Sequence, residues 1–329
     1  MRSSNIDEEY FVKSDDDVFV EKECINIPFV KNGDILITSA NGSSRLVGKH
    51  AIVDDLSSNS AVHGGFMLLA SSKNPYFINA SMSSPWYKKF IELYVSGGNG
   101  AIGNLNKNDL DNYDVVVPKN NEQIKIGDLF KNIDSLITLH QRKHDKLMDI
   151  KKSLLEKMFP TSGESKPKIR FKGFNDAWEQ REAKELCSIT TGKSNTQDQV
   201  EDGKYIFFIR SDVPVRSNRY LYDEEAVITI GDGNIGRVFH YVNGKFDLHQ
   251  RCYKMSDFRY LTAKYFYYFF STKFYDRAMS MTAKATVDSV RLEMISDMDI
   301  RYPKELNEQN KISAFLNNID SLITLHQRM

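Results

Sequence analysis

An exact internal repeat constrains this chain more than any other feature of its sequence. Residues Asn132–Arg142 read NIDSLITLHQR, and Asn318–Arg328 repeat the same letters 186 positions later. A repeat separated by more than the length of a domain indicates a duplicated architecture. A chain of 329 residues is also long enough for about two domains. We therefore expect two similar units in tandem.

The similarity of the two copies extends upstream of the identical segment. The first copy follows Pro118-Lys119, Glu122-Gln123 and Lys125-Ile126, and the second follows Pro303-Lys304, Glu308-Gln309 and Lys311-Ile312. Farther upstream, Asp34–Thr38 parallels Glu225–Thr229, and His63 occupies the place of His249. Each unit is thus predicted to be a long mixed segment followed by a helix.

Both copies of the repeat are predicted to lie on long helices. From Glu122 to Met158 apolar residues recur every three or four positions, and Pro160 ends the pattern. At about 1.5 Å per residue this helix is roughly 50–60 Å long, too long to bury its apolar stripe inside a small domain. We expect it to pack against the second copy, as in a coiled coil. The expected seam, which would also serve subunit docking, comprises Ile126, Phe130, Ile133, Ile137, His140, Leu147, Ile312, Ile319, Leu322 and His326.

Two of these seam residues, His140 and His326, occupy equivalent places. The two histidines could form a pH-sensitive or metal-binding pair, or they could be polar residues that fix the register of the helices. The second interpretation is favoured.

The segments between the helices have the composition of mixed strands and helices. Strands are predicted at Asp34–Thr38, Asp114–Val117, Tyr205–Ile209, Ala226–Ile230, Arg237–Val242 and Met298–Tyr302, and helices at Trp86–Val95 and Thr262–Ser280. The second of these helices is rich in aromatic residues. Tyr265, Tyr268, Phe269 and Tyr275 could stack on nucleic-acid bases, but their helical spacing favours a place in the core. The fold class is therefore expected to be α+β.

Two glycine-rich segments match G-x-G-x-x-G, the fingerprint of dinucleotide binding. Neither Gly98–Gly103 nor Gly231–Gly236 is followed by the crossover helix that this fingerprint needs. The second segment is better explained as the turn of a β-hairpin. The sequence also lacks a Walker A motif, HExxH and G-x-S-x-G. These observations favour a binding function over catalysis.

Composition narrows the class of protein only slightly. Lys and Arg total 44, as do Asp and Glu, so net charge provides no bulk attraction to nucleic acid, although a local basic face stays possible. Cys24, Cys187 and Cys252 are scattered, which fits a reduced cytoplasm better than a disulfide framework or zinc site. The sequence shows no signal peptide and no membrane-spanning run.

The segment IDSLITLHQRKHDKLMDIKKSLLEKMFP (Ile133–Pro160) followed by FKGFNDAWEQREAKEL (Phe171–Leu186) resembles the DNA specificity subunit of type I restriction–modification enzymes. The resemblance implies a non-catalytic cytoplasmic subunit of a phage-defence system. Its two target recognition domains would each recognise half of a split double-stranded DNA site. Two long helices would pack as an antiparallel coiled coil that spaces these domains and docks two methyltransferase subunits. Restriction/translocase subunits would join the complex, and S-adenosylmethionine, ATP and Mg²⁺ would belong to those partners.

The resemblance also implies domain boundaries. They are a first target recognition domain at 1–119, a helix at 120–160, a linker at 161–170, a second target recognition domain at 171–303 and a second helix at 304–329. The first domain lacks the Trp-Glu-Gln opening of the second, and the second helix stops at Met329, so we expect both to be incomplete. An alternative is a truncated, silent or recombining cassette that binds partner subunits without recognising a site by itself.

DNA recognition requires Arg, Lys, Asn, Gln and Ser on exposed loops. In the first unit the candidates are Ser43, Ser44, Arg45, Lys49, Asn99 and Asn104. In the second unit they are Lys193, Arg210, Arg216, Asn218, Arg219, Asn234, Arg237, Arg251 and Lys284. For each of them, a solvated surface residue without a DNA contact is the alternative.

Overall fold

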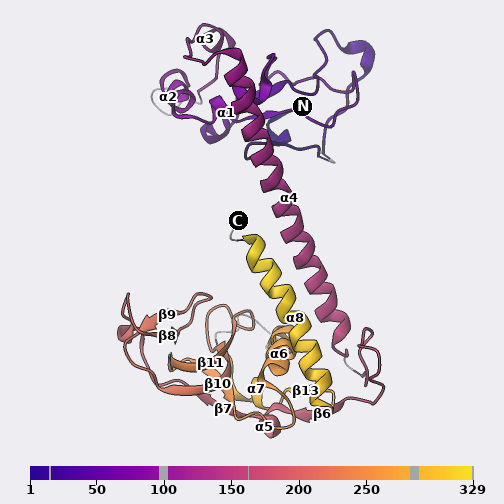
Figure 1. Cartoon of the computed structure of the whole chain (residues 1–329), viewed down its shortest axis with the longest axis vertical. Coiled ribbons are helices and arrows are strands. Elements are labelled where there is room, and N and C mark those ends of the chain that lie inside the picture. The colour runs from indigo at the N-terminus through magenta and orange to yellow at the C-terminus, as the bar shows by residue number, and fades with distance from the viewer. Residues whose placement is uncertain (15, 96–102, 162, 282–288, 328–329) are drawn as a thin grey trace. The chain divides into compact units, whose positions relative to one another are not determined.

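The structure is a computed structural model that describes residues 1–14, 16–95, 103–161, 163–281 and 289–327 (Figure 1). The chain divides into two compact units, Met1–Leu139 and His140–Met329, and each is described by itself. Within the described ranges, no helix combines the length and the apolar character needed to cross a membrane.

A three-stranded antiparallel sheet forms the centre of unit 1, in the order β4 (His50–Ile52), β3 (Ile35–Thr38), β5 (Met67–Ala70). All residues of β3 are buried because both faces of this central strand are covered. Successive side chains of a strand point to opposite faces. Ile35 and Ile37 therefore enter one core cluster, and Leu36 enters a second cluster on the other face. The strand predicted at Asp34–Thr38 is confirmed.

Helices α1 (Pro75–Met82) and α2 (Pro85–Tyr94) cover one face of this sheet. Each begins with a proline, whose missing N–H costs nothing in the first helical turn. The helix predicted at Trp86–Val95 is confirmed within one residue at each end. The other elements are β1 (Ile6–Asp7), β2 (Tyr10–Phe11), α3 (Lys107–Asp111) and 3-10 turns at Ser3–Asn5, Lys22–Cys24 and Ser44–Leu46.

Unit 2 contains a larger sheet of six strands. Their order is β7 (Ser188–Thr191), β12 (Cys252–Ser256), β10 (Tyr222–Ile230), β11 (Phe239–Leu248), β8 (Tyr205–Phe208), β9 (Val215–Ser217). Only the β8–β11 pair is parallel among these described strands. The strands predicted at Tyr205–Ile209, Ala226–Ile230 and Arg237–Val242 are confirmed, although β10 and β11 are longer than expected.

The six-stranded sheet is strongly curved. β11 ends near the start of β10, where Phe246 pairs with Tyr222. β12 begins at the opposite end of β10, where Cys252 pairs with Ile230. The short connection 249–251 reaches about 14 Å at most, whereas a straight β10 would separate these points by roughly 25 Å. The sheet must therefore curl, and its concave side holds a separate core cluster that includes Phe208, Ala226, Ile228, Val242 and Phe246.

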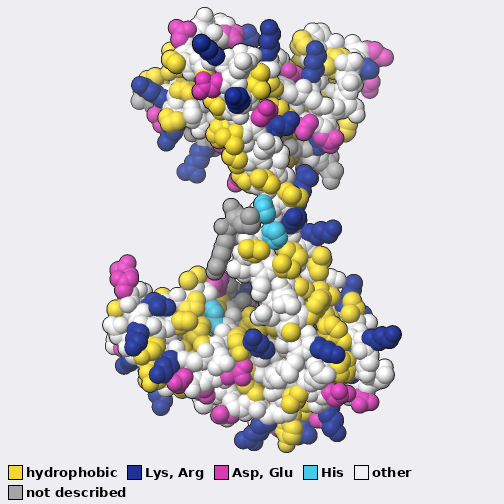
Figure 2. Space-filling view, in the orientation of Figure 1, with side chains coloured by type: hydrophobic (Ala, Val, Ile, Leu, Met, Phe, Trp, Pro, Cys, Tyr) yellow, Lys and Arg dark blue, Asp and Glu magenta, His cyan; other side chains and the backbone are white. Residues whose placement is uncertain are grey.

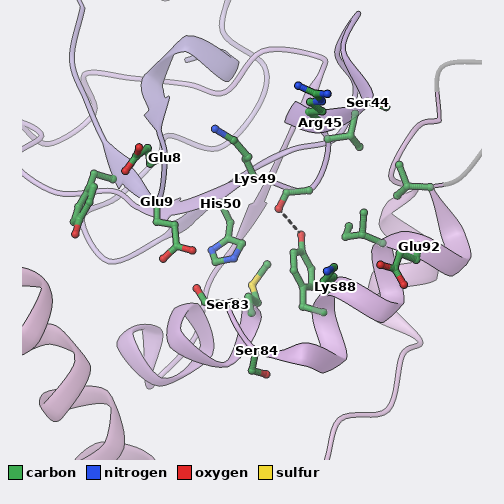
Figure 3. A pocket seen from close by; sticks show the side chains of 17 residues that line it. Glu8, Glu9, Ser44, Arg45, Lys49, His50, Ser83, Ser84, Lys88 and Glu92 are labelled. Atoms are coloured by element: carbon green, nitrogen blue, oxygen red, sulfur yellow. Dashed lines mark hydrogen bonds between the residues drawn. The ribbon is translucent and has the colours of Figure 1, made fainter. Parts of the chain in front are cut away.

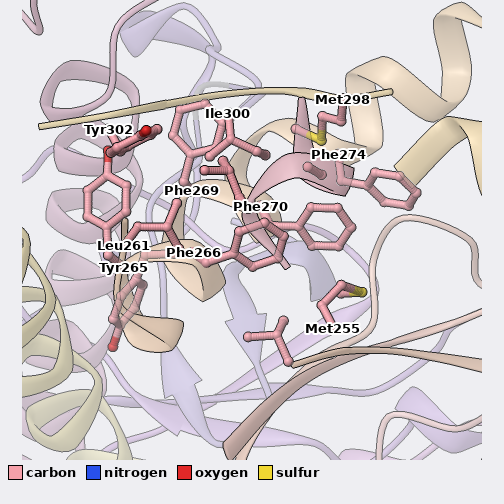
Figure 4. Close-up of a cluster of buried hydrophobic side chains, with 14 of the residues drawn as sticks. Met255, Leu261, Tyr265, Phe266, Phe269, Phe270, Phe274, Met298, Ile300 and Tyr302 are labelled. Atoms are coloured by element: carbon pink, nitrogen blue, oxygen red, sulfur yellow. The ribbon is translucent and has the colours of Figure 1, made fainter. Parts of the chain in front are cut away.

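Helix α6 (Ala263–Ser280) packs across the other side of this sheet (Figure 1). Its aromatic side chains form the main core of unit 2 together with Met255, Met298, Ile300 and Tyr302 (Figure 4). Among the four aromatic residues considered for base stacking, Tyr265, Tyr268 and Phe269 are buried and Tyr275 is half-buried. The core interpretation is therefore correct for the first three, and the helix predicted at Thr262–Ser280 is confirmed, with Thr262 as its N-cap.

A separate two-stranded sheet pairs β13 (Asp299–Tyr302) with β6 (Glu179–Glu182). This confirms the strand predicted at Met298–Tyr302. The corresponding prediction in unit 1, Asp114–Val117, is wrong, because these residues form no strand and Val116 and Val117 are exposed. A strand needs a hydrogen-bonded neighbour, and no described segment pairs with this one. Unit 2 also contains α5 (Ala183–Leu186), α7 (Leu292–Ser296) and a 3-10 turn at Thr196–Asp198.

The two units repeat the same strand register. In unit 1, β3 lies between β4 and β5, and Ile37 pairs with His50. In unit 2, β10 lies between β11 and β12, and Ile228 pairs with His240. The duplication inferred from the sequence therefore extends to the pairing of individual residues.

A glutamine at the start of each long helix makes the same contacts. Gln123 donates to the Pro118 carbonyl at 2.9 Å and accepts from Asn74, the N-cap of α1. Gln309 donates to the Pro303 carbonyl at 2.8 Å and accepts from the backbone N–H of Thr262. The Glu-Gln pair seen in both copies thus includes a residue that fixes each long helix to the N-cap of an earlier helix, α1 in unit 1 and α6 in unit 2.

Helix α4 spans Asn120–Met158 and α8 spans Leu306–Gln327, which confirms both long helices. Inside unit 2 they run antiparallel (Figure 1): His140 contacts His326, whereas Lys151 lies farther along α4 and contacts the earlier residue Asp320. Ile312, Leu316, Ile319 and Ile323 are buried in unit 2. Leu147, His140 and His326 are half-buried, as expected for the seam.

Four of the expected seam residues require correction. Leu322 is exposed because its neighbour Ile323, about 100° around the helix, is in phase with Leu316 and Ile319 and takes the buried position. Phe130, Ile133 and Ile137 are exposed as well. Their sequence provides the apolar stripe, but no part of the described chain buries it. Ile126 is half-buried, beside Gly127, where a Cβ would lie only 2.8 Å from the Phe77 backbone N of α1.

Candidate nucleic-acid interface

Equivalent hairpin turns of the two units present many of the predicted DNA-binding residues. The β3–β4 turn lies at 39–49 and the β10–β11 turn at 231–238. A later backbone segment fixes the base of each turn in the same way. Leu105 N–H donates to the Ser39 carbonyl at 2.7 Å, and Val290 N–H donates to the Gly231 carbonyl at 2.6 Å. Each turn is therefore a fixed projection rather than a free loop.

In unit 2, a single carboxylate positions two predicted arginines. Asp232 accepts from Arg210 at 3.2 Å and from Arg251 at 3.0 Å. Arg210 follows β8 and Arg251 precedes β12, so the curvature of the sheet brings them together at the turn. Both guanidinium groups stay substantially exposed, while Asp232 is mostly buried. The cluster has a net positive charge and offers planar donors suited to phosphate oxygens or to a guanine edge.

The glycines of this turn are required by its backbone. Gly233 and Gly236 have φ of +85° and +68°, a conformation that other residues adopt rarely. A Cβ at Gly236 would also lie 3.1 Å from the Tyr275 Cα. This confirms that Gly231–Gly236 is a hairpin turn, with Asn234 exposed at its tip. Lys193, in the neighbouring loop after β7, is exposed as well.

Arg219 is engaged mainly inside the unit. It donates to Asp198 at 2.6 Å, to Ser194 at 2.9 Å and to Asp247 at 3.4 Å. Asp247 is fully buried. A buried carboxylate without a cation is costly, so the structure gives Arg219 a stabilising role that its sequence position did not indicate.

Three more candidates also have partners within unit 2. Arg216 donates to the Gly203 carbonyl at 2.8 Å, and Asn218 accepts from the backbone N–H of Lys204 at 3.3 Å. The Arg237 guanidinium lies 4.5 Å from the centre of the Tyr275 ring and also donates to its hydroxyl. These groups hold the turn and the β9 edge in place. Lys284 lies outside the described residues.

Two residues that organise this surface, Asp232 and His249, are absent from the candidates predicted from the sequence. The His249 Nδ1 accepts from the backbone N–H of Arg251 at 3.1 Å. Burial and then the nearby Arg210 charge lower the His249 pKa, which favours the neutral ring that can accept this bond. The equivalence of His63 and His249 was the one available signal for His249. For Asp232 no signal existed, because the arginines it joins are distant in sequence.

In unit 1, the equivalent turn borders a cavity of about 980 Å³ (Figure 3). Ser44, Arg45 and Lys49 of the turn line it, as predicted candidates. α2 contributes Lys88 and Glu92, and the β1–β2 region contributes Glu8 and Glu9 (Figure 3). The charges are mixed, so this cavity favours a polar ligand without a general preference for anions.

Close packing fixes the unit 1 turn against α2. The Tyr87 hydroxyl donates to the Gly48 carbonyl at 2.9 Å (Figure 3). Gly48 has φ of +85°, and a Cβ there would lie 2.5 Å from Ile91 Cδ1. His50 lies below the turn with Nδ1 3.0 Å from Asn79 Oδ1, and burial lowers its pKa. His50 and Lys88 are absent from the candidates predicted from the sequence. For Lys88 the available signal was the Ser-Ser-Pro break that ends α1 and begins α2.

The other unit 1 candidates are exposed or undescribed. Ser43 is exposed within the turn, Asn104 is exposed beside it, and Asn99 lies outside the described residues. Basic, acidic and apolar side chains are intermingled over the visible face of each unit (Figure 2). The local arrangement of a few basic groups on the turns, and not bulk charge, is therefore the feature that can distinguish these surfaces.

Comparison with known proteins agrees with this duplicated architecture. The family model described as "Type I restriction modification DNA specificity domain" matches residues 17–148 and 175–329. The crystal structure of a type I restriction–modification S subunit from M. genitalium is similar with a TM-score of 0.63 and 14% identity, over 100% of this chain and 87% of that one.

Two further solved structures are more distant. The HsdS subunit from Thermoanaerobacter tengcongensis matches with a TM-score of 0.46 and 14% identity, over 91% of this chain and 76% of that one. A chain from a study of assembly and conformational transition of the type I system matches with a TM-score of 0.48 and 15% identity, over 91% and 77%. No curated protein matched the chain. From the family model, which matches most of its length in two copies, the chain belongs to the type I restriction–modification DNA specificity family.

Proposed function

We propose that this chain is the DNA-recognition and scaffold subunit of a type I restriction–modification complex. Each unit would recognise one half of a bipartite double-stranded site through its hairpin turn and the loops beside it. The chain itself would perform no chemistry. Methyltransferase subunits would supply S-adenosylmethionine, restriction/translocase subunits would use ATP and Mg²⁺, and the complex would act in the cytoplasm.

The observation that supports this proposal best is the equivalence of the two turns. Both project from the same edge of the repeated three-strand arrangement, and both are fixed at the base by the same type of backbone hydrogen bond. Their side chains differ, with Ser43, Ser44 and Arg45 in unit 1 and Asn234 with the Arg210–Arg251 pair in unit 2. Two similar supports with different contact residues suit an asymmetric two-part site, because base-edge contacts determine sequence preference.

Docking of two identical partner subunits is supported by a second equivalence. On α4, Leu129, Leu136 and Leu139 are 57, 56 and 47% exposed. On α8, the equivalent Phe315, Leu322 and Leu325 are 39, 46 and 55% exposed. Apolar side chains that stay exposed in both copies, along one side of each helix, are typical of an interaction surface. We propose that each stripe docks one methyltransferase subunit.

Methylome sequencing tests the recognition proposal. Cells would express the chain with its cognate methyltransferase, and the expected result is a bipartite methylated motif. Exchanging residues 39–49 for the turn of a relative should change one half of the motif and leave the other half unchanged. A complex that assembles but methylates no motif would contradict recognition and would favour a cassette that only binds partners.

Co-purification tests the docking proposal. The wild-type chain should retain two methyltransferase subunits, and Leu136→Asp or Leu322→Asp should each leave one, because a carboxylate would enter a desolvated contact. Lys49→Ala, on the unit 1 turn, is the matched control and should retain both. Retention of two subunits by both aspartate variants would contradict this docking surface.

A further inference from the structure

Arg210 and Arg251 bind their shared acceptor, Asp232, through the same atom. The Arg210 Nη1 donates to Oδ1 at 3.4 Å and to Oδ2 at 3.2 Å, and the Arg251 Nη1 donates to Oδ2 at 3.0 Å. Within the described ranges, neither guanidinium makes any other hydrogen bond. A guanidinium carries five N–H donors in a planar fork. Each arginine therefore keeps its Nε–Nη2 edge free, with two parallel donors.

The backbone that carries these groups is fixed as well. Gly231 N–H, at the base of the turn, donates to the Arg251 carbonyl at 2.7 Å. β8 ends two residues before Arg210, and the carbonyl of its last residue accepts from His249 N–H at 3.0 Å. Asp232 is itself mostly buried, at 13% exposed. A carboxylate held in this way orients a guanidinium before DNA arrives, which lowers the entropic cost of a specific contact.

The free edge of Arg210 suits a guanine better than a phosphate. Guanine presents N7 and O6 as neighbouring acceptors in the major groove, whereas adenine presents N7 beside an N6 donor. Two parallel donors therefore accept guanine and reject adenine. A phosphate would bring a full negative charge close to Asp232, which repels it, while a base edge carries only partial charges. Arg210 is also the more constrained arginine, at 46% exposed against 63% for Arg251.

Unit 1 has no carboxylate at the corresponding position. The segments that match in the two units end at Thr38 and Thr229, and three residues farther on stand Asn41 and Asp232. Asn41 donates to the Ser3 hydroxyl at 2.9 Å and carries no charge. The held arginine is thus a feature of one unit, and it can give the two halves of a site different base preferences.

We propose that Arg210 recognises a guanine in the half-site of unit 2 and that Asp232 is its positioning residue. The inference rests on the proposed DNA recognition and adds the base and the residues responsible. Asp232 has two opposite effects on binding. It reduces the positive charge of the surface, which weakens binding to DNA of any sequence, and it orients Arg210, which strengthens binding to the cognate site alone.

A modified base tests the guanine. In the methylated motif, the half that survives exchange of residues 39–49 belongs to unit 2. 7-Deazaguanine, which lacks the N7 acceptor but keeps its base pairing, would replace each guanine of this half in turn. Anisotropy titration of the assembled complex should show a loss of about tenfold at one position. Arg210→Ala should lose a similar factor on the unmodified duplex and nothing more on the modified one.

The outcomes separate this inference from the function on which it rests. A unit 2 half-site without guanine, or a wild-type complex that binds every 7-deazaguanine duplex normally, would overturn the assignment of Arg210. A complex that assembles but methylates no motif would instead contradict DNA recognition itself.

Two substitutions test the role of Asp232. Asp232→Ala should lower the ratio of cognate to scrambled-duplex affinity by about tenfold, while the scrambled duplex binds equally well or more tightly at low salt. Asp232→Asn keeps the shape and one acceptor oxygen and should lower the ratio less. Asp223→Ala is the matched control, because it removes an exposed carboxylate of the same unit, 3.9 Å from the Lys245 Nζ, and should leave the ratio unchanged. Equal weakening of both duplexes by the two Asp232 variants would show a merely structural role and overturn the positioning role.

Discussion

The Nδ1 atoms of His140 and His326 lie 3.0 Å apart, although 186 residues separate them. They are the same residue of two identical sequence copies, and the antiparallel helices bring them side by side. One ring must donate while the other accepts, so the two copies of one residue adopt different tautomers. An exact sequence repeat has thus produced a contact in which its two members play unequal roles.

Removing one histidine should cost more than removing both. His326→Leu leaves His140 half-buried without its partner, which should lower the free energy of unfolding by about 1 kcal/mol. His140→Leu with His326→Leu replaces a polar pair by an apolar contact and should be neutral or slightly stabilising. Urea unfolding of the two single variants and the double variant would measure this coupling. Additive losses in the double variant would contradict the hydrogen bond.

The two glutamines that start the long helices should differ in their contribution to stability. Gln309 is fully buried and serves Thr262 N–H and the carbonyls of Tyr260 and Pro303. Gln309→Leu leaves these buried groups unpaired and should destabilise unit 2 by about 2–4 kcal/mol. Gln123 is half-buried, so Gln123→Leu should cost unit 1 only about 1 kcal/mol.

Each unit has its own fluorescent reporter for these measurements. The chain has two tryptophans, Trp86 in unit 1 and Trp178 in unit 2. Trp178→Phe leaves a reporter for unit 1, and Trp86→Phe leaves one for unit 2. Equal losses for Gln123→Leu and Gln309→Leu in the two backgrounds would contradict the difference in burial.

Both units should lose stability in mild acid through equivalent histidines. Burial lowers the pKa of His50 and of His240. Below about pH 6.5 the unfolded chain takes up a proton that the folded ring resists, so this stability is present above pH 6.5 and is lost as pH falls. The slope is at most about 1.4 kcal/mol per pH unit for each histidine.

Unfolding of the Trp178→Phe chain between pH 5 and 8 would measure this effect in unit 1. His50→Gln keeps a group that can bond to Asn79 and should flatten the slope. His63→Gln, at a less buried position, is the control and should leave it unchanged. A slope that survives His50→Gln would assign the acid sensitivity to another group.

The sequence predicted the helices and strands better than it predicted the burial and contacts of individual side chains. Periodicity was enough for α4, α6 and β3, because the spacing of apolar residues reflects the local geometry of a helix or strand. It could not distinguish Ile133 from Ile319, since identical letters become buried or exposed according to segments elsewhere in the chain. Likewise, the role of Asp232 depends on the curvature of a sheet that brings Arg210 and Arg251 together. The role of a side chain cannot be predicted from one sequence when it depends on contacts between segments that are distant in the chain.

Arg251→Ala should weaken DNA binding in a salt-dependent way if its guanidinium contacts a phosphate. Loss of one phosphate contact reduces the slope of log K against log salt concentration by about 1 and affects all sequences similarly. Loss of a guanine contact would instead cost about 1–3 kcal/mol on the cognate duplex alone. Anisotropy titrations of the assembled complex, on cognate and scrambled duplexes at several salt concentrations, separate these outcomes. Arg216→Ala is an informative comparison because Arg216 donates to Gly203, and it should affect stability more than the salt slope. Unchanged binding of both duplexes by Arg251→Ala would remove Arg251 from the interface.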